Sequence, residues 1–560
     1  MLDVVGRSQR GRICEYRVGE GCLRTPAVLG QEGDCRVAVT EAGRVLSLFG
    51  SEISLDPQIM TTASSGVKCQ PMCKDGIAVL RLPVSGDEVI PDDCEVVAVP
   101  NAFELRGNFR AMVDQVMKVR RAAGFGRLVA MFGIAEPANL ALLSYMGVDL
   151  FDEGFARASG VNGYALIPEG RMFAGDDRSE ENVSEMGREI SKIHTYINAG
   201  RLRELVDQRS FAYADQVAAL RVFDLEGYGY QEEACPVTGG RFSCNTTQSL
   251  RRPDVARYQK TLLERYVPPE HKKVLLLLPC SAKKPYHISK THKFFAQAIH
   301  TGQHDTLVHE VIVTSPLGIV PRELDAFYPA NSYDIPVTGE WKPEEKETIR
   351  RMLQELLEKH HYEKVVCHLG EDAELVEGMF PDMVETVVGD SVSPASLENL
   401  DKALKAATEG MTPVKWDTDR KEAVRSALSF QFGKDVADAL LEGDTVAMGK
   451  YPYWKLFRKV DGKNVQLGMM SAERAMFSLT PEGGEVLMRM GKNVVEIMDF
   501  EIKGSLFAVG VVKADHGIRI GDEIVAVCNG VVKGVGVAAM CGAEMEQMKR
   551  GVAVKMRRYH

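Results

Sequence analysis

The feature that most constrains the fold is a series of short apolar runs, each followed by a loop and an amphipathic helix. The clearest run covers residues 274–278, which are all valine or leucine, and Pro279 and Cys280 follow it directly. A continuously apolar run of this length predicts a strand buried on both faces of a parallel sheet. Further strands are expected at residues 309–324 and 362–370, with an amphipathic helix at residues 342–360 between them. This order predicts a compact doubly wound α/β domain.

The rest of the chain is organised around the same kind of pattern. Short strands alternate with helical stretches over the first 230 residues, which predicts a parallel sheet or an α/β barrel. Short strands separated by Gly and Asp turns near the end of the chain predict a small β-barrel. A length of 560 residues is compatible with three to five domains. We expect modules at residues 1–265, 270–402, 403–482 and 483–560, the third being a small α+β linker domain.

Composition excludes several classes of protein. Apolar residues make up 45% and charged residues 26% of the chain, which excludes collagen and disordered chains. The apolar runs are too short for a membrane helix, the first residues lack the apolar region of a signal peptide, and twelve cysteines are too few for a disulfide framework. We expect a soluble cytoplasmic protein with reduced thiols and no membrane partner.

Two basic islands lie on a chain of formal net charge −10. Residues 251–293 contain eleven lysine or arginine residues and three acidic residues, a balance of +8, and the last twelve residues contain no acid. Such islands either attract the phosphates of nucleic acid or are ordinary solvated faces. If they bind RNA, the expected contacts are Arg251, Arg252, Lys549, Arg550, Lys555, Arg557 and Arg558.

The C-terminal residues resemble a PUA domain, the small RNA-binding barrel of RNA-modifying enzymes. The residues that carry the resemblance are Gly504, Ile520, Gly521, Asp522, Gly534, Gly536 and the basic segment 551–559. The resemblance implies RNA binding at the last strand. The alternative is an incidentally basic edge strand, because lysine on an edge also blocks aggregation.

Segments in the first half of the chain resemble tRNA-guanine transglycosylases, which are TIM barrels. They read GCLRTPAVLG, VPNAFELRGNF, NLALLSYMGVDLFDE and CNTTQSLRRPDVARYQKTLLERY. The Asp-Ser-Gly-Gly-Phe-Gln stretch of active members is missing, and the corresponding residues 61–73 read TTASSGVKCQPMC. The family's CxCxxC-plus-His zinc set is also missing, because Cys235 and Cys244 are nine apart and Cys69 and Cys73 are four apart. We therefore expect a degenerate barrel without base exchange, no metal ligands and no required cofactor, although zinc is left open.

The sharpest motif is the segment 279–292, which reads PC, three residues, KPY, two residues, S, two residues, H. It resembles the signature of the archaeosine synthase family, the archaeal paralogues of the transglycosylases, and the segments VTSPLGIVPREL and YDIPVTGEW resemble that family too. The resemblance extends over essentially the whole chain. It implies a transferase acting on tRNA that carries 7-cyano-7-deazaguanine (preQ0) at position 15.

The resemblance also implies the co-substrates. We expect addition of free L-lysine to the nitrile through its side-chain amine, followed by cleavage of the adduct by a radical SAM partner subunit. The alternative nitrogen donors are glutamine and ammonia. A homodimer is compatible with the transglycosylase resemblance. Two rival functions are an active tRNA-guanine(15) transglycosylase and a non-catalytic subunit that delivers tRNA.

The motif offers the groups that addition to a nitrile requires, a nucleophile and a proton donor. The candidate catalytic residues are Cys280, Lys284, Tyr286, Ser289 and His292. Cys280 is expected to attack the nitrile and form a thioimidate that an amine then displaces, with His292 and Tyr286 as proton donors. Ser289 would orient the substrate or hold a phosphate. In the alternative, Cys280 has no covalent role and His292 deprotonates the incoming lysine amine.

Three further residues are expected to bind substrate. Lys283 lies beside Lys284, and both are expected to favour the thiolate of Cys280. Arg322 and Asp334 follow in the next loops and are candidates for binding lysine or the base.

Overall fold

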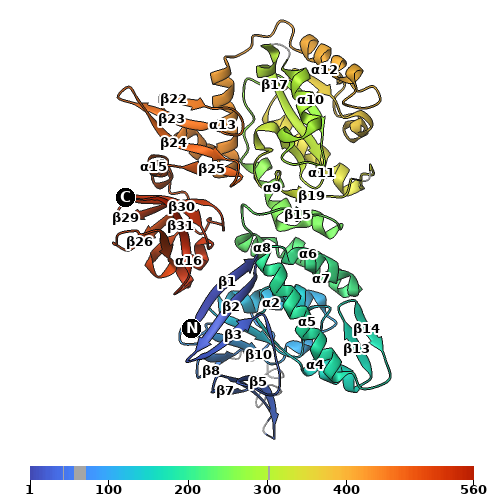
Figure 1. Cartoon of the computed structure of the whole chain (residues 1–560), viewed down its shortest axis with the longest axis vertical. Helices are drawn as coiled ribbons and strands as arrows, with labels where there is room; N and C mark the ends of the chain where they lie inside the picture. Colours follow the sequence, from blue (N-terminus) through green and yellow to red (C-terminus); the bar gives the residue numbers. More distant parts are fainter. Residues whose placement is uncertain (42, 56–70, 301–302, 338, 560) are drawn as a thin grey trace. The chain divides into compact units, whose positions relative to one another are not determined.

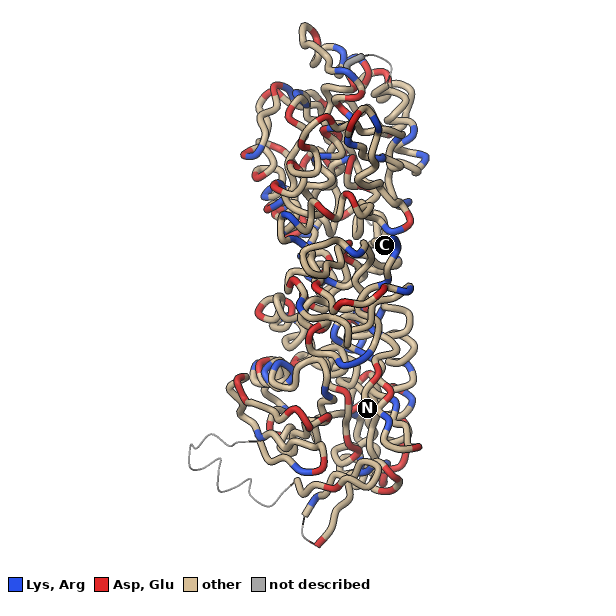
Figure 2. The backbone as a smooth tube through the Cα atoms, turned by 90° about the vertical axis from the view of Figure 1, so that its left-hand side faces the viewer, with Lys and Arg blue, Asp and Glu red and all other residues tan. Residues whose placement is uncertain are grey.

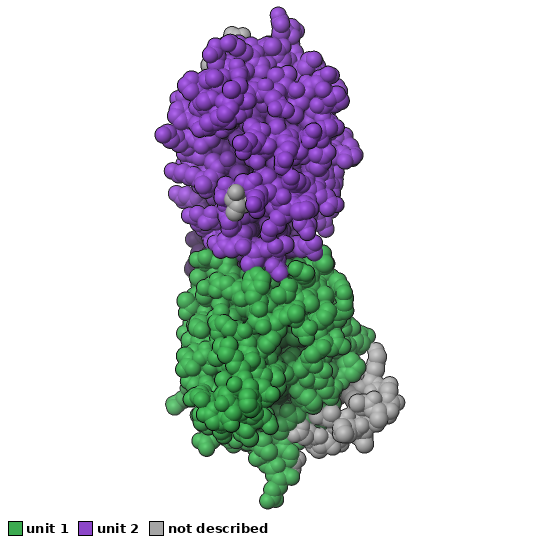
Figure 3. Space-filling model, turned by 90° about the vertical axis from the view of Figure 1, so that its right-hand side faces the viewer, with its two compact units in different colours: residues 1–235, 507–510, 543–553 green, residues 236–506, 511–542, 554–560 purple. Residues whose placement is uncertain are grey.

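The computed structural model describes residues 1–41, 43–55, 71–300, 303–337 and 339–559 (Figure 1). The chain forms two compact units (Figure 3). Unit 1 contains residues 1–235, 507–510 and 543–553, and unit 2 contains residues 236–506, 511–542 and 554–560. The predicted mixed α/β class is confirmed, whereas the four module boundaries stay a prediction.

The main sheet of unit 1 has six strands in the order β4-β12-β11-β10-β9-β8. Every neighbouring pair is parallel except β8–β9. The strands are β4 (Ala27–Leu29), β8 (Met72–Lys74), β9 (Ile77–Val79), β10 (Val96–Val99), β11 (Leu128–Met131) and β12 (Leu150–Asp152). The described residues thus give the parallel strands that were predicted for a degenerate barrel, but no closed ring of eight.

Helices and smaller sheets surround this sheet. Unit 1 contains the antiparallel sheets β1 (Leu2–Ser8), β2 (Gly11–Val18), β3 (Gly21–Thr25); β5 (Cys35–Thr40), β6 (Gly43–Leu48), β7 (Ser51–Ser54); and β13 (Tyr164–Ile167), β14 (Gly170–Phe173). Its helices are η1 (Ala102–Leu105), α2 (Phe109–Ala123), α3 (Leu140–Tyr145), α4 (Gly154–Val161), α5 (Ser179–Asn198), α6 (Leu202–Arg209), η2 (Ser210–Ala212), α7 (Ala214–Glu226) and α8 (Tyr228–Ala234). Helix α2 shows why the elements form: Asn108 caps its first turn, and its apolar residues at helical spacing are buried.

Unit 2 contains a five-stranded sheet of order β18-β17-β16-β20-β21, drawn in green and yellow in Figure 1. The strands are β16 (Val274–Pro279), β17 (Val308–Thr314), β18 (Gly318–Pro321), β20 (Lys364–Cys367) and β21 (Val384–Glu385). All pairs are parallel except β17–β18. Strand β16 is central, and the chain moves first to β17 on one side of it and later to β20 on the other. This is the doubly wound order that the sequence predicted.

The segment expected to be a strand that breaks into a loop, residues 309–324, instead contains two antiparallel strands, β17 and β18. Helix α11 (Pro343–Lys359) begins at the predicted proline and buries Ile349, Met352, Leu353 and Leu356. The other helices of this part are η3 (Gln248–Arg251), α9 (Pro253–Glu264), η4 (Tyr286–Ile288), α10 (Lys290–Ile299), η5 (Gln303–Leu307), η6 (Arg322–Leu324), η7 (Gly370–Val376) and α12 (Pro394–Ala407). Two short strands, β15 (Phe242–Ser243) and β19 (Tyr333–Asp334), pair in parallel beside the main sheet.

An antiparallel four-stranded sheet follows helices α13 (Trp416–Phe432) and α14 (Lys434–Leu440). Its strands are β22 (Thr445–Met448), β23 (Lys455–Val460), β24 (Lys463–Ser471) and β25 (Met476–Leu479), and α15 (Pro481–Met490) leads out of it. The C-terminal sheet has the order β27-β31-β30-β29-β26-β28. It consists of β26 (Val494–Ile497), β27 (Ser505–Phe507), β28 (Val511–Ala514), β29 (Glu523–Cys528), β30 (Val531–Ala538) and β31 (Val552–Tyr559), with η8 (Ala508–Gly510) and α16 (Gly542–Gln547).

Basic and acidic residues are interspersed along most of the chain (Figure 2). Part of the basic island at residues 251–293 is used inside the protein, because Lys272 pairs with Asp419 at 2.7 Å and both side chains are largely buried. Within the described ranges, no helix has the length and apolar character that crossing a membrane requires.

Candidate active site

The loop after β16 carries the motif and begins at the carboxyl edge of the unit 2 sheet. Pro279 is in register with Val313 of β17, and Leu277 is in register with Cys367 of β20. The carboxyl ends of β16, β17 and β20 therefore lie at one edge of the sheet. From β16 the chain first crosses to β17 on one side and later to β20 on the other side. Open α/β sheets bind ligands at such a switch point, so Cys280 stands where a reacting group is expected.

The Cys280 thiol is half-buried and has three polar neighbours. It forms a hydrogen bond with the Thr314 hydroxyl at the end of β17, and the charges of Lys284 and Asp372 act on its pKa in opposite directions. Burial raises the pKa of Cys280, although Lys284 and Thr314 oppose the shift. The lysine that acts on Cys280 favours the thiolate, as expected, but desolvation outweighs its charge in the free protein.

Lys284 is that lysine. Its ammonium nitrogen lies 4.1 Å from the centroid of the Tyr333 ring, a cation–π contact. Burial lowers the pKa of Lys284, although Cys280 and Asp334 oppose the shift. A half-buried ammonium with a lowered pKa can give or take a proton more readily than a surface lysine can. Lys283 is exposed, and its carbonyl accepts a hydrogen bond from the Ser281 hydroxyl.

Three hydroxyl groups meet beneath Cys280. The Tyr286 hydroxyl lies 3.1 Å from Thr314 Oγ1, and the Tyr333 hydroxyl contacts both groups. Tyr286 and Tyr333 are fully buried, and burial raises the pKa of Tyr286 well above its usual range. Tyr286 therefore stays protonated and bound to its neighbours. We infer that it positions Thr314, the hydrogen-bond partner of the Cys280 thiol.

Ser289 and His292 have roles inside helix α10. Ser289 caps the helix by accepting a hydrogen bond from the His292 backbone N–H at 3.2 Å, so its hydroxyl is committed there. The His292 ring is 1% exposed, and Arg322 Nη2 donates to its Nδ1 at 2.8 Å. Burial, followed by the Arg322 charge, lowers the pKa of His292 to about 3. The lowered pKa disfavours a protonated imidazolium near neutral pH, so the catalytic role of His292 stays a prediction, whereas its bond to Arg322 favours a positioning role.

Arg322 is also committed within the protein. Its guanidinium donates to Glu310 and Asp325 as well as to His292, and its side chain is 18% exposed. Asp325 is buried and accepts from the His287 backbone N–H at 2.7 Å and from the Tyr451 hydroxyl. The predicted substrate contact of Arg322 stays a prediction, and this network gives its guanidinium a further role, which is to fix the motif loop.

Asp334 is the predicted substrate-binding residue that the structure places beside the loop. It follows Tyr333 in β19, and its side chain is 43% exposed. Arg241 donates to it at 2.8 Å from a segment 93 positions earlier, which sequence reasoning missed. Asp372 in η7 was also missed: Trp341 Nε1 donates to it at 2.7 Å. Arg241 and Asp372 are each held by a residue from a distant part of the sequence, and such contacts leave no pattern in the sequence.

The predicted RNA contacts fall into two groups. Five of them are exposed: Arg251, Lys549, Arg550, Lys555 and Arg558. The remaining two are Arg252 and Arg557. Arg252 is 3% exposed and pairs with Asp254, so we correct its predicted RNA contact. The Arg557 side chain is 27% exposed and pairs with the fully buried Glu523, so its RNA contact stays a prediction that this pairing opposes.

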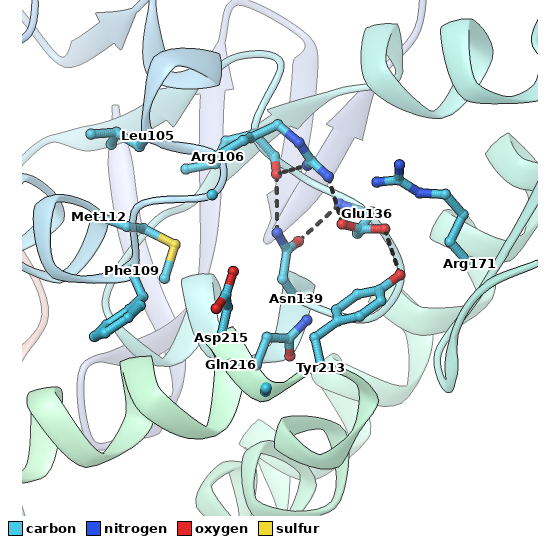
Figure 4. A pocket seen from close by; sticks show the side chains of 13 residues that line it. Leu105, Arg106, Phe109, Met112, Glu136, Asn139, Arg171, Tyr213, Asp215 and Gln216 are labelled. Atoms are coloured by element: carbon cyan, nitrogen blue, oxygen red, sulfur yellow. Dashed lines mark hydrogen bonds and ion pairs between the residues drawn. The ribbon is translucent and has the colours of Figure 1, made fainter.

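Unit 1 contains a separate cavity of about 550 Å³ at the carboxyl ends of β10 and β11 (Figure 4). Its polar side centres on Glu136, whose carboxylate accepts from Arg106 at 2.6 Å and from the Tyr213 hydroxyl at 3.2 Å. Its apolar side is formed by Leu105, Phe109, Met112 and Ile134. A cavity with an apolar wall and one edge of donors and acceptors has the make-up of a small-molecule binding pocket.

The predicted lack of zinc ligands can be examined in part. In the ranges that the structure describes, no three His, Cys, Asp or Glu side chains are grouped so that they could hold a metal. Cys69 and most of the stretch that replaces the transglycosylase aspartate lie outside these ranges.

Comparison with known proteins gives the following matches. A family described as "Domain of unknown function (DUF5591)" matches residues 255–404, which include the motif loop, and the PUA domain family matches residues 495–560. Archaeosine synthase subunit alpha of Thermoplasma acidophilum is 33% identical over 84% of this chain and 89% of its own length. The protein of the same name from Methanosarcina acetivorans is 34% identical over 83% of this chain and 79% of its own. The tRNA-guanine(15) transglycosylase of Methanobrevibacter smithii is 25% identical over 80% of this chain and 69% of its own.

These matches confirm the predicted resemblances to a PUA domain and to the transglycosylase paralogues. Each of the two archaeosine synthase subunits is more than 30% identical over more than four fifths of this chain. The chain therefore belongs to the archaeosine synthase family.

Proposed function

We propose that this protein modifies the nitrile of 7-cyano-7-deazaguanine at position 15 of tRNA, and that it does so by adding free L-lysine through the side-chain amine. The adduct would then pass to a radical SAM partner subunit for cleavage to archaeosine. Membership in the archaeosine synthase family supports the overall activity. The observation that carries the assignment of the site is the position of Cys280 and Lys284 at the switch point of the unit 2 sheet.

In the covalent route, the Cys280 sulfur bonds to the nitrile carbon and a proton is delivered to the nitrile nitrogen, which gives a thioimidate. The lysine amine then adds to that carbon, and the carbon–sulfur bond breaks as the thiol is restored. Because the thiol is protonated at rest, a base must take its proton as the sulfur attacks. Lys284 in its neutral form is the nearest candidate, and its lowered pKa makes that form accessible.

In the direct route, the lysine amine adds to the nitrile without a bond to sulfur. The incoming amine must first lose its proton, and we propose Asp372, whose charge acts on Cys280, as the acceptor. Trapping distinguishes the two routes. A mass adduct joining Cys280 to the tRNA base in the absence of lysine supports the thioimidate, whereas turnover by Cys280→Ser supports direct addition.

In both routes the nitrile carbon must reach the groups around Cys280. We therefore propose that the modified base binds at the motif loop of unit 2, and the Glu136 cavity of unit 1 is not assigned a step of this reaction.

The main experiment incubates preQ0-bearing tRNA with lysine and this protein alone. The expected product is a tRNA base heavier by one lysine, detected by mass spectrometry after digestion. Lys284→Met and Cys280→Ser should each lower its yield at least tenfold, whereas Cys22→Ser, which alters an exposed thiol in unit 1, should not. No mass change with lysine but conversion with glutamine or ammonia would replace lysine addition by the direct amidino route. Incorporation of free preQ0 into unmodified tRNA would instead favour a transglycosylase.

A further inference from the structure

An exposed ion pair borders the motif loop in unit 2. The two-residue strands β15 and β19 pair in parallel, with Phe242 opposite Tyr333. This pairing brings Arg241, just before β15, to Asp334, at the end of β19. Arg241 Nη2 lies 2.8 Å from Asp334 Oδ2, and the two side chains are 72% and 43% exposed.

The ion pair lies next to the reactive lysine. Tyr333, the residue before Asp334, has its ring 4.1 Å from the Lys284 ammonium. The Asp334 carboxylate and the Arg241 guanidinium both act on the pKa of Lys284, as does Cys280. One short strand therefore links the Cys280–Lys284 pair to a pair of opposite charges that face solvent.

Fold stability gives little reason for this pair. An exposed ion pair contributes little to the stability of the fold, so Arg241 and Asp334 can exchange their mutual contact for a ligand at low cost. A free amino acid is a zwitterion that presents a carboxylate and an ammonium group on the same carbon. Arginine binds carboxylates through two parallel N–H donors, and aspartate pairs with ammonium groups.

We propose that Arg241 and Asp334 recognise the α-carboxylate and the α-ammonium group of the free amino acid, respectively. The proposal rests on the proposed lysine addition and names what selects lysine over a simple diamine. The main alternative ligand is an RNA phosphate. Asp334 argues against it, because a carboxylate beside the arginine repels a polyanion but complements a zwitterion.

The test compares lysine with 1,5-diaminopentane, which has the same reacting amine and chain but no α-carboxylate. The wild-type protein should prefer lysine in kcat/KM by at least tenfold. Arg241→Ala should remove most of this preference by raising the KM for lysine, so that kcat/KM falls at least fivefold more for lysine than for the diamine. Asp334→Ala should also raise the KM for lysine. Arg351→Ala, which breaks an exposed ion pair with Glu355 on helix α11, is the matched control and should leave both substrates unchanged.

The other outcomes are distinguishable. If the wild-type protein adds no lysine at all, the proposed function fails, and this proposal fails with it. If it adds lysine but Arg241→Ala and Asp334→Ala keep the preference over the diamine, the function stands and the recognition role is overturned. If Arg241→Ala weakens tRNA binding and leaves the KM for lysine unchanged, the pair binds RNA and the proposal is likewise overturned.

Discussion

Two neighbouring arginines on the last strand should have opposite roles. Arg557 and Arg558 have the same charge and the same chemistry. Arg557 points into unit 2 and pairs with Glu523, whereas Arg558 is exposed on β31. We predict that Arg557→Ala lowers stability without changing the salt dependence of tRNA binding. Arg558→Ala should do the reverse.

The size of each effect follows from the surroundings. Glu523 has no exposed side-chain surface, and without Arg557 it keeps only Arg474 at 2.9 Å and the Leu479 N–H at 2.9 Å. Removing one partner of a buried ion pair costs about 3–5 kcal/mol. Because two partners remain, we expect about 3 kcal/mol, which corresponds to roughly a hundredfold faster amide exchange in β29 and β31. Loss of one phosphate contact by Arg558 should reduce the slope of log K against log salt by about 0.7–0.9.

The assay combines hydrogen exchange with tRNA binding measured by fluorescence anisotropy between 50 and 300 mM KCl. Lys555→Ala serves as a second exposed variant and should behave like Arg558→Ala. If Arg557→Ala lowers the salt slope as much as Arg558→Ala does while the exchange of β29 is unchanged, the two arginines do not have opposite roles. If neither exposed variant alters the slope, the basic strand makes no phosphate contact.

Three other predictions follow from the described contacts. Because burial raises the pKa of Cys280, its alkylation by iodoacetamide should be slow at pH 7, and the alkylation rate should still increase beyond pH 9. Lys284→Met should move this pH–rate profile to still higher pH. A rate that reaches a plateau below pH 8 would contradict the prediction. The pKa of His292, about 3 in the folded protein, lies below the value of about 6.5 expected when unfolded. The neutral His292 ring therefore contributes its full stabilisation of the folded state above the pKa of the unfolded state, and this contribution is lost as the pH falls toward 3. The urea midpoint should drop less between pH 7 and pH 5 in His292→Gln than in the wild-type protein, and equal drops would argue against a buried neutral ring. Finally, Tyr333→Leu removes the aromatic ring that contacts Lys284. A cation–π contact contributes about 0.5–2 kcal/mol, so the rate of lysine addition should fall by about two- to thirtyfold. Tyr333→Phe keeps the ring and should retain most of the wild-type rate.

The fold was predictable where local patterns decide it. The apolar run at residues 274–278 predicted the central strand, and the Pro343 start with apolar residues at helical spacing predicted α11. The sequence did not predict that the chain reverses before Gly318 and that β18 pairs antiparallel with β17. The two strands are equally apolar, so the sequence pattern does not separate them. The sequence also did not show which basic residues are exposed to solvent. Arg252 has the same local sequence character as Arg251 but is enclosed with Asp254.

The candidate site was predictable only in part, for a related reason. Sequence spacing located the Cys280 loop at a strand end, which is a local property. The partners that decide its chemistry come from distant segments: Thr314 from β17, Tyr333 from β19 and Asp372 from η7. The burial of Cys280 and His292 could not be read from the sequence either. It outweighs the lysine charge at Cys280 and makes His292 neutral, and burial depends on the packing of the whole unit.

The spacing of the motif can now be explained by two kinds of role. Cys280 and Lys284 flank the opening of the loop and are half-buried, so they can meet a ligand. Tyr286, Ser289 and His292 are each at most 2% exposed: Tyr286 binds Thr314, Ser289 caps α10, and His292 accepts from Arg322. These three fix the path of the loop over the end of the sheet, because each joins it to a different element. A motif residue can thus be essential without touching substrate, and substitutions at these three positions should reduce activity through the position of Cys280 and Lys284 rather than through a lost proton transfer.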